Sequence, residues 1–403
     1  MNSSSEERPA LWNEVRVLLL IALAVFTYTI GIGILNGTDL VDFDIKRILA
    51  HVHAGTLGWI TTAVFAAALW LFGEGRPLSG PERTAARWLS VAAIVVFPAY
   101  VVAFTFTVEE VRPLAGVLAL AVIGAFFVWT LARARNSDLS VPHWGFLAAL
   151  GTSIVGGVLG VLWGFDIATG KDLIPDGREE AHPAVMVVGF LIPVGLAMAE
   201  WAFTFPRPPK ATRAGIIQMI FPFLGGIVLA VALLLEADPL TPLAVVLEVI
   251  GVVIFAVRMW PSFRAVRWFE ADPGRHGVIA SVSIAFTIGL AMYFVIRYEG
   301  DFDLVPDHQI LALDHSNFVG VMTNAVFAMV IAATLSGGRW RSLDHLIFAG
   351  VNAGLVVFIV GLMGDWTWPK RIATPVMGAT LLIAVVLYWI RLLEERVASS
   401  AAE

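Results

Sequence analysis

The chain has 403 residues, of which 58% are hydrophobic and only 14% are charged. Soluble domains carry charge on about 25% of their residues, so this chain lacks the polar surface of a water-soluble fold. The net charge is -6 and the basic residues form no stripe along the sequence, which argues against nucleic acid as a partner. The absence of cysteine excludes disulfides, iron–sulfur clusters and thiolate-bound metals.

Apolar blocks of about 20 residues, the length that crosses the hydrocarbon of a bilayer, follow one another along the chain. Backbone groups in lipid must bond internally, so each block is predicted to be a helix. The sequence therefore predicts an all-α polytopic membrane protein with about twelve transmembrane helices in a single domain, 1–403. The first block is too long for a signal peptide and is expected to be the first span. The expected spans are 15–36, 47–72, 87–107, 113–133, 143–165, 181–203, 213–235, 240–260, 275–297, 312–335, 343–364 and 371–393.

The lysine and arginine residues predict the orientation, because cytoplasmic loops hold most of the basic residues. Most of the 26 lie in segments on the side of the N-terminus. The exceptions are Lys46, Arg47, Arg112, Lys171, Arg178, Arg297, Lys370 and Arg371. The chain is therefore expected to be a multi-pass protein of the cell (inner) membrane, surrounded by membrane lipid, with both termini in the cytoplasm.

Histidines open every fourth predicted span. His51 and His53 lie at the start of the second span, His182 at the start of the sixth and His315 at the start of the tenth. Repeats of this kind are typical of pseudo-symmetric membrane folds, here three arcs of four helices. The arcs are expected at about 15–135, 143–260 and 275–393.

The sequences around these histidines align on a shared glycine. The glycines are Gly58, Gly189 and Gly320. His51 and His182 each lie seven residues before their glycine. His53 and His315 each lie five residues before theirs. All four are therefore expected at one depth near the outer face, and one helix from each arc around a shared centre would bring three imidazoles together.

In a chain without cysteine, imidazole is the available ligand for haem iron or copper. His51, His53 and His315 are the candidate cofactor ligands, and His182 and His308, on the same side of the membrane, are candidate metal ligands. His51 and His53 point about 200° apart on a helix, so only one of them can face a given metal, and the sequence leaves open which. The competing interpretation is that each histidine is an interfacial residue bonded to a loop.

The segments 51–59 (His-Val-His-Ala-Gly-Thr-Leu-Gly-Trp) and 315–323 (His-Ser-Asn-Phe-Val-Gly-Val-Met-Thr) resemble the NnrS family. That family is similar to a minimal form of the haem–copper oxidase subunit I. The resemblance implies twelve helices, a haem b between the second and tenth helices near the outer face, and a diatomic gas, nitric oxide or oxygen, as the molecule handled or sensed. It also implies an electron donor as a partner.

The sequence departs from the oxidase pattern in two places. Oxidases have two histidines on the tenth helix, whereas here only His315 falls inside that span, and the seventh span, 213–235, has no histidine pair for copper. If the chain is an enzyme, it is expected to be an oxidoreductase without the full oxidase copper site. His182 remains available for a second metal site, with copper as one candidate, or for a distal pocket.

Other polar residues also fall inside predicted spans. Glu248 lies in the middle of the eighth span, where a carboxylate is costly, so it is a candidate for a proton path or a neutral acid bonded to a neighbouring helix. Glu200 is expected to reach the interface at the end of the sixth span. Gln218, Asn324 and Asn352 are expected to form hydrogen bonds between helices.

Three functions follow from these patterns. The first is a haem-binding membrane protein of the oxidase and NnrS type that handles or senses a diatomic gas. The second is a transporter or metal-ion permease, with the histidines and the acidic outer loops collecting a cation. The third is a structural partner of a respiratory complex.

Overall fold

The computed structural model describes residues 9–135, 137–175, 177–237, 239–300, 302–334 and 339–400. Within this part, twelve helices are long and apolar enough to cross a membrane, as the sequence predicts. Nine are single α-helices: α1 (Trp12–Gly37), α4 (Gly80–Phe106), α5 (Val111–Ala134), α6 (Val141–Thr169), α9 (Arg213–Leu234), α10 (Leu240–Ala265), α11 (Pro273–Arg297), α14 (Arg341–Met363) and α15 (Thr367–Ser400).

The second, sixth and tenth spans are composite, because each contains a π-helical segment. The second is α2 (Ile45–His53), η1 (Ala54–Thr61) and α3 (Thr62–Gly73). The sixth is α7 (Ala181–Ala184), η2 (Val185–Leu191) and α8 (Ile192–Thr204). The tenth is α12 (Asp307–His315), η4 (Ser316–Thr323) and α13 (Asn324–Ala333). The π-helical segments recur at the same four-helix interval as the histidines.

Hydroxyl groups bond to carbonyls in the widened π-helical turns. Thr61 Oγ1 donates to the carbonyl of Thr56, 2.9 Å away, and Thr323 Oγ1 to that of Phe318, also at 2.9 Å. In η2 the donor comes from a neighbouring span, since Thr152 on α6 bonds to a carbonyl of that segment. These bonds allow irregular backbone inside a membrane, where an unbonded carbonyl costs several kcal/mol.

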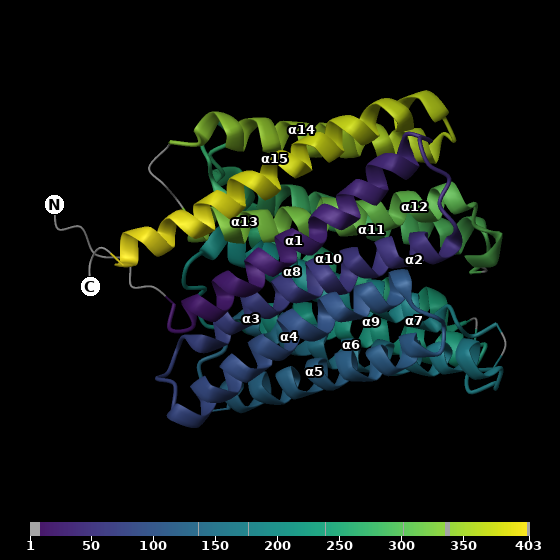
Figure 1. Cartoon of the computed structure of the whole chain (residues 1–403), viewed down its shortest axis with the longest axis horizontal. Coiled ribbons are helices and arrows are strands. Elements are labelled where there is room, and N and C mark those ends of the chain that lie inside the picture. The colour runs from purple at the N-terminus through teal and green to yellow at the C-terminus, as the bar shows by residue number, and fades with distance from the viewer. Residues whose placement is uncertain are drawn as a thin grey trace.

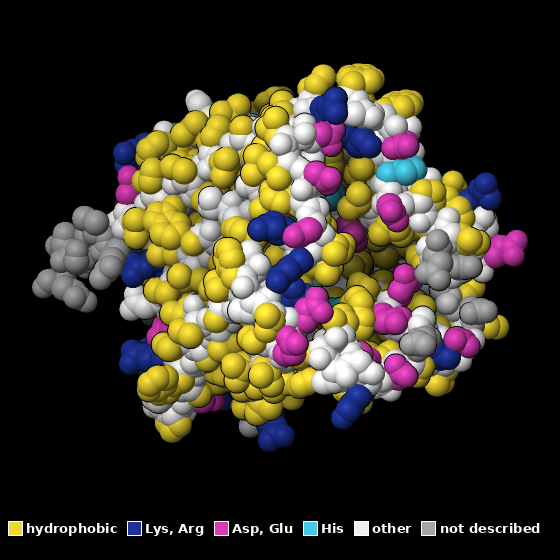
Figure 2. Space-filling view, turned by 45° about the vertical axis from the view of Figure 1, so that its right-hand side comes forward, with side chains coloured by type: hydrophobic (Ala, Val, Ile, Leu, Met, Phe, Trp, Pro, Cys, Tyr) yellow, Lys and Arg dark blue, Asp and Glu magenta, His cyan; other side chains and the backbone are white. Residues whose placement is uncertain are grey.

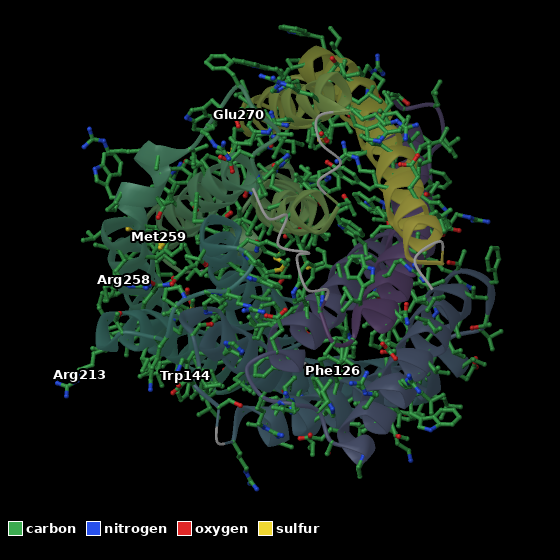
Figure 3. All side chains as sticks on the ribbon, turned by 90° about the vertical axis from the view of Figure 1, so that its left-hand side faces the viewer. Phe126, Trp144, Arg213, Arg258, Met259 and Glu270 are labelled. Atoms are coloured by element: carbon green, nitrogen blue, oxygen red, sulfur yellow. The ribbon has the colours of Figure 1, made fainter. Side chains whose placement is uncertain are left out.

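The composite spans occupy the centre of the bundle. Their most apolar windows are 83%, 78% and 83% buried, whereas those of the other nine spans are 33–56% buried. The outer helices pack around the centre and expose apolar side chains, as a protein in contact with lipid does (Figures 1 and 3). The start of α1 and the end of α15 lie at one end of the bundle, the terminal end, and α2, α7 and α12 lie at the other, the histidine end (Figure 1).

The start of α4 differs clearly from the sequence prediction. The helix begins at Gly80, seven residues before the predicted start at 87. Ser79 and Glu82 form a capping box, which starts the helix in polar sequence before the apolar block begins. Likewise α12 begins at Asp307 rather than 312. Apolar length predicts the part of α4 in hydrocarbon, and its capping box sets where the helix starts.

Packing between α9 and η2 generates a prediction about stability. A Cβ at Gly226 would clash with Gly189 Cα, whereas one at Gly289 would meet nothing within 4 Å. Gly226→Ala is expected to push α9 from the sixth span and to lower the free energy of unfolding by about 1–3 kcal/mol. Gly289→Ala, the matched control, should leave it unchanged or raise it. Thermal unfolding in detergent measures both, and equal effects would contradict this packing.

Candidate functional site

The four candidate histidines lie on the central spans, next to the π-helical segments. His53 and His315 are the last residues of α2 and α12, directly before η1 and η4, and His182 lies three residues before η2. Each of the four keeps part of its surface exposed, although it belongs to a central span. Figure 2, turned so that the histidine end comes forward, shows a hollow there with acidic side chains around it. The partial exposure of the four histidines shows that protein atoms do not cover them completely.

His51 and His182 are each fixed to the span that precedes their own. His51 Nδ1 is 3.0 Å from the carbonyl oxygen of Thr29 on α1. His182 Nδ1 is 2.8 Å from the carbonyl oxygen of Gly156 on α6. The two residues, which the sequence alignment matched, thus make the same interaction in two different arcs.

On each preceding span, a glycine one turn after the bonded carbonyl leaves space for the imidazole ring of His51 or His182. A Cβ at Gly33 would lie 3.3 Å from His51 Cε1, and one at Gly160 would lie 2.6 Å from His182 Cε1. Gly160 on α6 therefore packs directly against the imidazole of His182.

His53 and His315 form a second matched set. Each bonds through Nδ1 to a carbonyl of its own helix, 2.8 Å from the oxygen of Leu49 and of Leu311 respectively. Each ring also contacts a phenylalanine of the span that follows. The centroid of His53 is 4.2 Å from that of Phe104 on α4, and the centroid of His315 is 4.9 Å from that of Phe358 on α14.

These bonds fix the tautomer of all four imidazoles. A backbone carbonyl only accepts hydrogen bonds, so Nδ1 carries the ring proton in each case. Nε2 is then unprotonated and keeps a lone pair. A metal-ligating histidine has this same arrangement, with one nitrogen donating to a carbonyl and the other binding the metal.

The four imidazoles form two pairs. His51 and His315 are close enough to interact electrostatically, and so are His53 and His182. His51 contacts α1 and His315 contacts α14, so the first histidine pair lies on the side of the centre that α1, α14 and α15 cover. By the same contacts, the second histidine pair lies on the side that α4, α5 and α6 cover.

The expectation that three imidazoles meet at a shared centre is wrong. No three or more His, Asp or Glu side chains of the described residues are grouped so as to hold a metal ion. The reason is the position of each histidine relative to its glycine. In each pair, one histidine lies five residues before the glycine of its central span, and the other lies seven residues before the glycine of another central span. By the same rule, a third pair would consist of Ala184 and Leu313, and neither of these is a histidine.

The pairing also bears on the choice between His51 and His53. The two rings contact different outer helices, α1 and α4, so they face different sides of the second span. His51 belongs with His315, and His53 belongs with His182. His308 lies elsewhere: its Nδ1 is 2.8 Å from the carbonyl oxygen of Leu362 near the end of α14, and its role as a metal ligand stays a prediction.

Glu248 is buried between α9 and α10, with 1% of its surface exposed. Neither carboxyl oxygen has a hydrogen-bond partner among the described residues. The carboxyl group of Glu248 fits against α9 because residue 225 is a glycine; a Cβ at Gly225 would lie 2.6 Å from Glu248 Oε1. The expected bond to a neighbouring helix is therefore not formed, and burial of the charged acid would be costly.

Glu200 does not reach the interface as expected, because it is 4% exposed. Arg258 on α10, labelled in Figure 3, binds both of its carboxylate oxygens at 2.9 Å, and Gln218 bonds to the same group. A cation on a neighbouring helix thus holds the acid inside the bundle. The predicted hydrogen bonds of Gln218 and of Asn324 with Asn352 are confirmed.

Arg112 is a residue that the sequence analysis used only for orientation. Its side chain is 11% exposed, and its closest carboxylate, that of Glu109, lies 4.0 Å away. Neither Nε nor Nη2 has a hydrogen-bond partner among the described residues. The guanidinium carbon lies 4.7 Å from the ring centroid of Phe104, the residue stacked on His53. Its position in the arginine-poor segments at the histidine end was the available signal.

No model of a known protein family matches the chain, and no curated protein matches it.

The two buried glutamates generate a prediction. Glu200→Gln leaves Arg258 without a counter-charge inside the bundle. Because the arginine side chain is 20% exposed, the loss of stability is expected at about 3 kcal/mol, the lower end of the range for breaking a buried ion pair. Glu248→Gln replaces an acid without a partner by a neutral side chain of the same shape and should change stability little. Thermal unfolding in detergent compares the two, and a larger loss for Glu248→Gln would refute the assignment.

Proposed function

We propose that the chain is a membrane haem protein that handles or senses a diatomic gas such as nitric oxide or oxygen. Haem b would be held by the first histidine pair, His51 and His315. The observation that carries the proposal is the presence of two imidazoles on adjoining central spans, each with Nδ1 bonded to a carbonyl and Nε2 free. The resemblance of the segments 51–59 and 315–323 to the NnrS family points the same way.

Two imidazoles suit a haem better than a bare ion. Zinc or copper bound by a protein takes three or four protein ligands, whereas haem iron already has four ring nitrogens and needs only axial ligands. Since the described residues group no third ligand with either pair, a metal that brings its own ring is the cofactor that fits. When bound, haem would supply an iron that changes oxidation state and can take a gas.

The two residues of the first pair would have different roles. His51 is bonded to a second helix through Thr29 and packed against Gly33, so its ring is held from outside its own span. His315 bonds only within its own helix, to Leu311. His51 would therefore be the more rigidly held of the two haem-binding residues, and His315 the one more free to move.

Glu248 is the candidate for moving a proton within the membrane. As a buried acid without a partner it would rest in its protonated form, and transfer of its proton would break no ion pair. Because α9, in the seventh position, carries no histidine, an oxidase-type copper site is not part of the proposal. If there is turnover, the activity is that of an oxidoreductase fed by an electron donor, with both termini in the cytoplasm and the histidine end outside.

The second candidate is a transporter or metal-ion permease, and one observation favours it. The hollow at the histidine end is rimmed by acidic side chains, which would attract a cation (Figure 2). This function predicts metal-dependent uptake into vesicles by a protein that contains no porphyrin. If the chain is instead a purely structural partner of a respiratory complex, its substitution should prevent assembly of that complex, and the purified chain should have no haem spectrum.

The haem proposal predicts a spectrum that depends on particular histidines. Protein purified after expression with haem supply should show Soret absorbance. His51→Ala and His315→Ala should each lower the haem content, since each removes one of the two imidazoles that would hold the haem. His308→Ala is the matched control, because His308 also bonds to a carbonyl but belongs to neither pair, and its haem content should stay that of the parent. A parent protein without Soret absorbance would end the proposal.

A further inference from the structure

The second histidine pair has surroundings that the proposed function does not use. His53 and His182 lie on the side of the centre covered by α4, α5 and α6, away from the first pair. We propose that this pair forms a second haem site and that Arg112 binds a carboxylate of the haem bound there. The inference rests on the proposal that the chain binds haem, and it adds a second haem and a residue that positions it.

The two imidazoles are prepared as ligands in the same way as those of the first pair. His53 Nδ1 bonds to the carbonyl of Leu49, and His182 Nδ1 to that of Gly156, so Nε2 is free on both rings. Both side chains keep exposed surface inside the bundle. The Gly160 position, without a side chain, lets the ring of His182 lie directly against α6.

Aromatic side chains line this side of the centre. Besides Phe104, stacked on His53, the ring of Tyr100 has its centroid 5.4 Å from that of His53. The ring of Trp163 has its centroid 6.3 Å from that of His182. Flat apolar rings beside the ligands suit a flat apolar macrocycle, which gains most from contact with such surfaces.

Arg112 decides between a porphyrin and a bare metal ion. It lies close enough to His53 to interact with it electrostatically, and its Nε and Nη2 have no hydrogen-bond partner among the described residues. A cation in this position repels a metal dication. It attracts an anion, and a guanidinium binds a carboxylate through two parallel hydrogen bonds. Haem combines the two requirements, because it brings iron for the imidazoles and carboxylates for the arginine.

The alignment of the central spans indicates which substitutions at His53 and His182 should be compatible with the fold. The residue that matches His53 in the sixth span is Ala184, and the residue that matches His182 in the tenth span is Leu313. His53→Ala and His182→Leu therefore place at each site the side chain that the equivalent position holds. Each substitution therefore introduces a side chain that the protein already has at the matching position of another central span.

The first test is the haem content per chain of the purified full-length protein, measured as the pyridine haemochrome. The parent should hold two haems, and His53→Ala and His182→Leu should each hold one. A parent with one haem, lost in His51→Ala but kept in His53→Ala, would overturn the second site and leave the proposed function standing. A parent with no haem would end both proposals.

The second test asks whether Arg112 binds a carboxylate. His51→Ala leaves the second site as the haem site, and in this background the apoprotein is titrated with haem b and with haem b dimethyl ester. Arg112 should make haem b bind at least tenfold more tightly than its ester. Arg112→Gln should abolish that preference, whereas Arg297→Gln, which alters an exposed arginine that also lies over an aromatic ring, should keep it. An equal affinity for the two haems with Arg112 present would refute this role.

Discussion

A backbone carbonyl inside a bilayer has no water to bond, and the three central spans meet this constraint while departing from α-helical geometry. Each contains a π-helical segment with a carbonyl bonded to a hydroxyl, from Thr61 and Thr323 on the same span or from Thr152 on a neighbour. The histidines lie immediately before these segments. The irregular backbone at the core of the bundle and the candidate ligands thus belong to one structural unit, which occurs three times.

Repetition of this unit explains why the histidines occur in pairs. In the alignment, each central span has two such positions, five and seven residues before its shared glycine, and four of the six carry histidine. The other two carry Ala184 and Leu313. Bonds through Nδ1 leave Nε2 free on every imidazole, so one scaffold presents two similar sets of candidate ligands.

The sequence predicted the spans well because hydrocarbon thickness fixes the length of an apolar helix. It missed the early start of α4, where the capping box of Ser79 and Glu82 begins the helix in polar sequence. The histidine repeat gave the depth of the ligands but not their pairing, since alignment along a chain does not say which helices are neighbours. From the sequence, Glu200 was misjudged and Arg112 was overlooked for a related reason, since the side chains around each residue come from other helices.

Two imidazoles bound to one iron give a low-spin ferric state, whereas a single imidazole and an open position give a high-spin state. The electron paramagnetic resonance spectrum of the oxidised full-length protein, purified after expression with haem supply, therefore tests the central claim most directly. Paired histidines predict a low-spin ferric signal of the bis-imidazole type that disappears when both His51 and His53 are replaced. A haem-loaded protein with only a high-spin signal would contradict the pairing, and a protein with no ferric haem signal would contradict the assignment of haem itself.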